Sequence, residues 1–97
     1  MIVQISQMAE ARHTISSDYF LKLLDDPNFQ REFLLSHLSK NYERSIKRLV
    51  SIAERELCLD LDSRERQRVA KRFQYRLAIL EFEKRVERTG DGWKLKL

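Results

Sequence analysis

The chain has 97 residues and a formal net charge of +4, with 42% hydrophobic and 35% charged residues but only two glycines and one proline. It is too apolar for a disordered tail and too poor in turn residues for an all-β protein. The basic excess lies in the middle of the chain, because residues 40–76 carry eleven basic and six acidic side chains. These properties predict a single, mainly all-α domain over residues 1–97.

The first part of the chain predicts short elements. Residues 2–5 are mostly β-branched, and we expect a short strand there. Ser16 and Ser17 are suitable N-caps for a short helix that ends near Asp25. Asp26 is then expected to cap the next helix, with Pro27 in the first helical position, where its missing N–H costs nothing.

A long second helix is predicted from Pro27 to about Leu57, because no residue in between demands a break. An apolar stripe recurs along it at spacings of three and four, which is typical of one helical face. The stripe consists of Leu35, Leu38, Tyr42, Ile46, Leu49, Ala53 and Leu57. Phe29 and Phe33 lie on another side of this helix, where they pack against the first helix unless a bend near residues 39–41 re-aims them.

A third helix is predicted after a connector at residues 59–61. Asp62 and Glu65 resemble a capping box at its start, and Gly90 suits the left-handed position after its end near Arg88. The tail at residues 93–97 alternates apolar and basic side chains, which indicates a strand. The predicted architecture is a long antiparallel helical hairpin with a short N-terminal helix and short terminal strands.

The third helix carries two apolar faces. One consists of Val69, Phe73, Leu77 and Leu80, and we assign it to the partner helix of the hairpin. A second consists of Tyr75, Ile79, Phe82 and Val86, on nearly the opposite side. A two-helix hairpin buries only one of these faces. The surplus face must therefore pack against the first helix, the terminal strands or another chain. Together with Phe29 and Phe33 it is the predicted protein interface, and its partner is a second copy of this chain or a different protein.

The strongest non-random feature is an arginine ladder, Arg64, Arg68, Arg72 and Arg76, in which four residues separate each member from the next. Like charges at this spacing repel one another along a helix. The predicted second helix adds four basic residues that are candidates for the same surface, Lys40, Arg44, Lys47 and Arg48. Guanidinium groups bind phosphate oxygens in pairs of hydrogen bonds, so this basic face predicts contacts with a nucleic-acid backbone. A solvated face, arginine stems that cover apolar surface, and an acidic protein partner are the alternatives.

Signals for catalysis or metal binding are weak. Glu10 and His13 have the Glu-x-x-His spacing of a carboxylate-bridged metal site, but the further ligands such a site needs are missing. Residues 60–64 resemble the start of a calcium loop, yet the required glycine is replaced by Glu65. His37 is expected at the surface, and Cys58 lies at a helix end that does not activate thiolates. We therefore expect no enzyme activity, no metal and no cofactor.

Two functions are left open. The first is a non-enzymatic nucleic-acid-binding protein or small subunit of a nucleoprotein complex, with DNA and RNA not distinguished. The second is a protein-interaction adaptor or regulator that uses the surplus apolar face. Binding to a membrane surface ranks last, and a helix-turn-helix DNA reader is disfavoured because the two main helices are each predicted to exceed twenty residues. One cysteine and no apparent signal peptide or membrane span predict a cytoplasmic protein.

Overall fold

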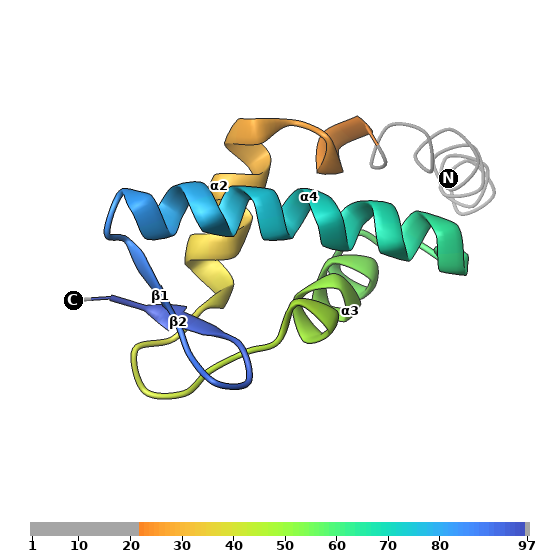
Figure 1. The fold of residues 1–97 in the computed structure, drawn as a ribbon. Helices are drawn as coiled ribbons and strands as arrows, with labels where there is room; N and C mark the ends of the chain where they lie inside the picture. Colours follow the sequence, from red (N-terminus) through yellow and green to blue (C-terminus); the bar gives the residue numbers. More distant parts are fainter. Residues whose placement is uncertain (1–21, 97) are drawn as a thin grey trace, which may run out of the picture.

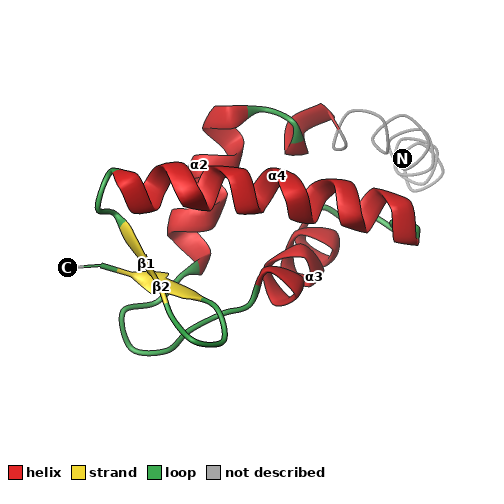
Figure 2. Ribbon diagram, in the orientation of Figure 1, coloured by secondary structure: helices red, strands yellow, loops and turns green. Residues whose placement is uncertain are grey.

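A computed structural model describes residues 22–96, and it is mostly helical with one small antiparallel sheet (Figures 1 and 2). The predictions for residues 1–21, which include the short strand, the start of the first helix and the Glu10–His13 pair, lie outside the described residues. Residues 22–24 are helical. The complete elements are α2 (Pro27–His37), α3 (Ile46–Glu56), α4 (Ser63–Phe82), β1 (Val86–Arg88) and β2 (Trp93–Leu95).

Helix α4 is the centre of the arrangement. Figure 1 shows α2 crossing behind its C-terminal half and α3 lying beneath its N-terminal half, with the β1–β2 hairpin beneath its C-terminal end. Residues 22–26 run along the opposite edge of α4. The inner stripe predicted for this helix, Val69, Phe73, Leu77 and Leu80, is buried as expected. Phe33 of α2 stacks on Phe73 with ring centroids 5.5 Å apart, so the core lies where α2 and α3 meet α4.

The predicted helix from Pro27 to Leu57 is wrong, because the chain leaves the helix after His37 and enters a new one at Ile46. The long antiparallel hairpin is therefore not confirmed. Two effects break the helix. Ser45 accepts a hydrogen bond from the backbone N–H of Arg48 and so caps a separate α3. The backbone between the two helices pairs instead with β2, through Leu95 N–H to the carbonyl of Ser39 and through Arg44.

The end predicted for the third helix is also wrong. Helix α4 stops at Phe82, and Lys84 adopts a left-handed conformation with φ 63°, the role predicted for Gly90. The backbone N–H of Arg85 then bonds the carbonyl of Leu80. Val86 follows in β1, where it is 1% exposed. Burying this valine in the sheet is the tertiary effect that overrides the helical pattern after residue 82.

The sheet joins three segments of the chain. In the β1–β2 hairpin, Val86 pairs with Leu95 and Arg88 with Trp93. Arg44 and Trp93 exchange both backbone hydrogen bonds at 2.9 Å, so residue 44 lies beside β2 on its other edge. A Cβ at Gly92 would lie 2.3 Å from the carbonyl oxygen of Arg44, so only glycine allows this approach. The tail strand is confirmed for residues 93–95.

Two of the N-caps predicted from sequence, Asp26 and Asp62, are confirmed. Asp26 accepts hydrogen bonds from the N–H groups of Asn28 and Phe29, with Pro27 at the first helical position. Asp62 and Glu65 form a reciprocal capping box at the start of α4. Within residues 22–96, no helix is both long and apolar enough to cross a membrane.

Candidate nucleic-acid interface

The side of α4 that points away from the core carries a row of polar side chains. We call it the outer face, and it consists of Arg64, Gln67, Lys71, Gln74 and Ala78. All five are exposed, and they recur at spacings of three and four, which places them on one side of the helix. Within residues 22–96, none of the four polar side chains forms a hydrogen bond or ion pair. The described part of the chain therefore leaves their donors and acceptors unoccupied.

The middle of the arginine ladder is engaged with an acid from a distant segment. Nη2 of Arg68 lies 2.8 Å from Oδ2 of Asp25, and Nε of Arg72 lies 3.3 Å from Oδ1 of the same carboxylate. The side chains of these arginines are 64% and 47% exposed, so both ion pairs are in contact with solvent. Asp25 therefore relieves the like-charge repulsion between these two arginines.

The end of the ladder is part of the interface between α2 and α4. Nε of Arg76 donates to Oε1 of Gln30 at 3.2 Å, and Nε2 of Gln30 donates to the carbonyl of Leu24 at 2.7 Å. Gln30 is 2% exposed. We call this set the Asp25 flank, and it consists of Asp25, Gln30, Arg68, Arg72 and Arg76.

The ladder divides between these two surfaces because of helix geometry. Four residues exceed one helical turn by about 40°, so each successive arginine is rotated around α4. Arg64 lies on the outer face, Arg68 and Arg72 lie beside Asp25, and Arg76 is half-buried against α2. The four side chains therefore do not form one free ridge.

The first turn of α3 carries Lys47 and Arg48, both exposed, and contains no acidic residue. Cations at this position oppose the helix dipole, whereas an anion would be favoured there. Arg48 also lines an open hollow of about 420 Å³ with Ser45 and with Asp91 of the hairpin turn. Glu43 lines it too, so acidic as well as basic side chains surround this hollow.

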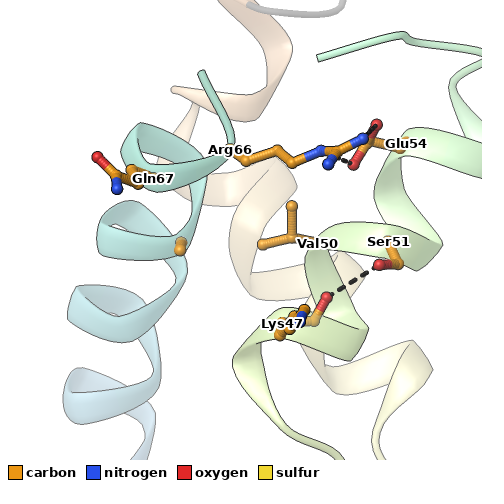
Figure 3. A pocket seen from close by; sticks show the side chains of 7 residues that line it. Lys47, Val50, Ser51, Glu54, Arg66 and Gln67 are labelled. Carbon is orange, nitrogen blue, oxygen red and sulfur yellow. Dashed lines mark hydrogen bonds and ion pairs between the residues drawn. The ribbon is translucent and has the colours of Figure 1, made fainter. Parts of the chain in front are cut away.

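A groove of about 340 Å³ separates α3 from α4 (Figure 3). Figure 3 shows Arg66 reaching across it to Glu54, with Val50 of α3 below and Gln67 pointing away from the ion pair. Nε and Nη2 of Arg66 lie 2.8 and 3.3 Å from the two carboxylate oxygens of Glu54. This two-point contact braces the two helices, and it leaves Lys47 and Gln67 at the rim of the groove.

The remaining two basic candidates lie between α2 and α3. Lys40 is exposed. Arg44 has structural contacts, since its backbone pairs with Trp93 and its guanidinium donates to the hydroxyl of Tyr42 at 3.0 Å. That hydrogen bond and the nearby positive charge lower the pKa of Tyr42 below its ordinary value. Nε of Arg44 is buried and has no hydrogen-bond partner within the described residues.

The residues predicted for a protein interface do not lie together on the surface. Phe33 and Val86 are in the core, at 6% and 1% exposed, so they are unavailable to a partner. Phe29 is partly buried against that core, and Ile79 is half-buried. Tyr75 and Phe82 alone in this set are strongly exposed, at 63% and 89%.

Sequence reasoning missed Gln67, Lys71 and Gln74 as candidate site residues. A signal was present, because these side chains recur at helical spacing opposite the stripe that contains Phe73 and Leu77. It also missed Asp25, whose contact with Arg68 spans 43 residues and leaves no local pattern. No metal cluster of His, Cys, Asp and Glu is present among residues 22–96.

No protein-family model matches the chain, and the comparisons with curated proteins and with solved structures gave no significant match.

Proposed function

We propose that this chain binds double-stranded DNA, with α3 and α4 as a helix-turn-helix unit and the β1–β2 hairpin as a wing beside it. Helix α3, the connection at residues 57–62 and α4 follow one another as helix, turn and helix, and the hairpin comes directly after α4. The Arg44–Trp93 bridge ties the residue just before the cap of α3 to β2, so the hairpin is held beside the helix pair.

The objection from helix length is met in part. It rested on two helices that were each expected to exceed twenty residues, whereas α3 has 11 residues and α4 has 20. Residues 57–62 form the connection between them. In helix-turn-helix proteins the second helix lies in the major groove and its side chains contact base edges, which is the role proposed for α4.

The observation that carries the proposal is the outer face of α4, on which cations and amides alternate without partners in the described chain. Arginine and lysine donate to guanine O6 and N7, and glutamine forms a paired contact with adenine. Side chains of both kinds at one helical spacing are suited to reading bases in addition to binding phosphate. An A-form RNA duplex has a major groove too narrow for this contact, so we assign DNA.

The start of α3 supports the same docking geometry. The side chains of Lys47 and Arg48 at its N-terminal end are suited to a phosphate beside the groove that α4 enters, and Ser45 already accepts the N–H of Arg48. The hairpin turn contains Asp91, so we expect no phosphate contact from the turn itself. The proposed footprint therefore consists of the outer face and the first turn of α3.

The test is fluorescence anisotropy with labelled duplex and single-stranded DNA and RNA at several salt concentrations. We expect duplex DNA to bind most tightly, with an affinity that falls steeply as salt rises. Lys71→Ala should weaken binding by about 1–3 kcal/mol because it removes a base or phosphate contact in the groove. Arg55→Ala, which removes one exposed cation from the far end of α3, is the matched control and should have little effect.

Absence of duplex binding at low salt would refute the proposal. Equal losses for Lys71→Ala and Arg55→Ala would show that net charge, not the outer face, determines affinity.

A second candidate is a protein-interaction adaptor, supported by the exposure of Phe82 and Tyr75 on α4. Exposed aromatic side chains of this kind are common at protein interfaces. Light scattering over a range of concentrations tests it for self-association. A constant monomer mass would remove the homodimer form of this candidate and leave only a different protein partner.

A further inference from the structure

The Asp25 flank contains two guanidinium groups arranged around one oxyanion. Arg68 holds Oδ2 of Asp25 at 2.8 Å, and Arg72 holds Oδ1 at 3.3 Å, so each carboxylate oxygen has its own guanidinium. The two arginines are one helical turn apart on α4 and converge on the same point. This is the geometry in which a pair of arginines binds a phosphate group, with a carboxylate in the phosphate position.

The location of this pair matters for the proposed DNA complex. A helix with its side chains is about 10–12 Å across and the major groove is about 12 Å wide, so both phosphate backbones run close beside a bound helix. On one side of the outer face lies the first turn of α3, and on the other lies the Asp25 flank. Arg68 is next to Arg64 and Lys71 on the surface of α4, and its side chain is 64% exposed. In the proposed complex, the Asp25 flank would therefore face the second phosphate backbone of the DNA.

From this geometry we propose that Arg68 and Arg72 form a phosphate site for the second DNA strand, and that Asp25 is the internal competitor that occupies the site in the free protein. The inference rests on the proposed function for its ligand. Solvent-exposed ion pairs are weak, whereas arginine binds phosphate through strong, charge-assisted hydrogen bonds, so exchange of the carboxylate for a phosphate is favourable. Arg76 remains bonded to Gln30 and is not part of the exchange.

The exchange has a structural consequence. Asp25 belongs to the segment 22–26 that precedes α2, and its two ion pairs connect this segment to α4. When a phosphate displaces the carboxylate, that connection is lost. By linkage, removing the Asp25 carboxylate while both arginines remain strengthens DNA binding, by at most the factor that the two ion pairs contributed.

Asp25→Asn tests the competition, and Asp26→Asn is its matched control. Both changes remove one negative charge from adjacent positions, so their general electrostatic effects on DNA binding are similar. Asparagine caps a helix about as well as aspartate, so Asp26→Asn leaves the start of α2 intact. We expect Asp25→Asn to bind duplex DNA about three- to tenfold more tightly than Asp26→Asn at equal salt.

Removing the two arginines completes the test as a double-mutant cycle. In a background with Arg68→Gln and Arg72→Gln, the difference between Asp25→Asn and Asp26→Asn should vanish, because the contested site is gone. Equal affinities of the two single variants would overturn the proposal. Weaker binding by Asp25→Asn would also overturn it, since Asp25 would then hold the arginines in place for DNA.

A measurement without DNA separates this inference from the proposed function. The NMR signal of the Nε–H of Arg72 should move in a saturable way on titration with inorganic pyrophosphate, and at lower concentrations in Asp25→Asn than in the native chain. This result, combined with no duplex binding, would refute the proposed function and retain the phosphate site. An unchanged signal in both proteins would refute the site itself.

Discussion

Helix α4 carries two polar surfaces, which differ in whether other segments of the chain provide partners for their side chains. On the Asp25 flank every arginine has a partner, either the Asp25 carboxylate or the amide of Gln30. On the outer face the side chains of Arg64, Gln67, Lys71 and Gln74 have none within residues 22–96. Both surfaces are rich in cations in the sequence. A row of charges on a helix therefore identifies a candidate ligand site only after the partners from distant segments are known.

The largest expected effect on stability distinguishes the buried side of α4 from its outer face. Phe73 is fully buried and stacked on Phe33, whereas its neighbour Gln74 is exposed. We expect Phe73→Ala to lower the free energy of unfolding by about 3–5 kcal/mol through lost contacts and a cavity. Gln74→Ala should change it by less than about 0.5 kcal/mol. Urea denaturation of the two variants measures both values, and a large loss in Gln74→Ala would show that the outer face is structural.

A smaller effect is expected for the buried part of the Asp25 flank. Gln30→Ala leaves the carbonyl of Leu24 and Nε of Arg76 without their side-chain partner. Because an unpaired buried polar group is costly, the free energy of unfolding should fall by about 1–3 kcal/mol. Affinity for duplex DNA, compared at a temperature where the variant is folded, should not change. A loss of affinity with stability retained would contradict the separation of the two surfaces.

Local signals in the sequence were sufficient for the starts of α2 and α4 and for the inner stripe of α4. Asp26 with Pro27, and Asp62 with Glu65, are short-range patterns whose hydrogen bonds form within three residues, so they do not depend on the rest of the fold. The buried stripe around Phe73 follows from helical period alone. These elements position the outer face, and its exposure follows from being opposite that stripe.

Long-range contacts account for what the sequence did not predict. The break after His37 depends on pairing between Arg44 and Trp93, which are far apart in the chain, and an apolar spacing that happened to continue through Leu38 and Tyr42 concealed it. The end of α4 depends on burying Val86 in the sheet. The partner of Arg68 and Arg72 comes from before α2. Helical periodicity contains no information about any of these contacts.

The smallest predicted effect on stability distinguishes the exposed ion pairs of the Asp25 flank from its buried hydrogen bonds. Arg72→Gln removes an exposed ion pair, so we expect a loss of only about 0.2–1 kcal/mol in the free energy of unfolding at low salt. At 1 M salt, where charges are screened beyond about 3 Å, that loss should largely disappear. The loss from Gln30→Ala should persist, because a buried neutral hydrogen bond is not screened. Urea denaturation of both variants at low and high salt measures the contrast. A salt-independent loss in Arg72→Gln would mean that the arginine acts through packing of its stem on α4, and Asp25 would then be held too weakly to compete with a phosphate.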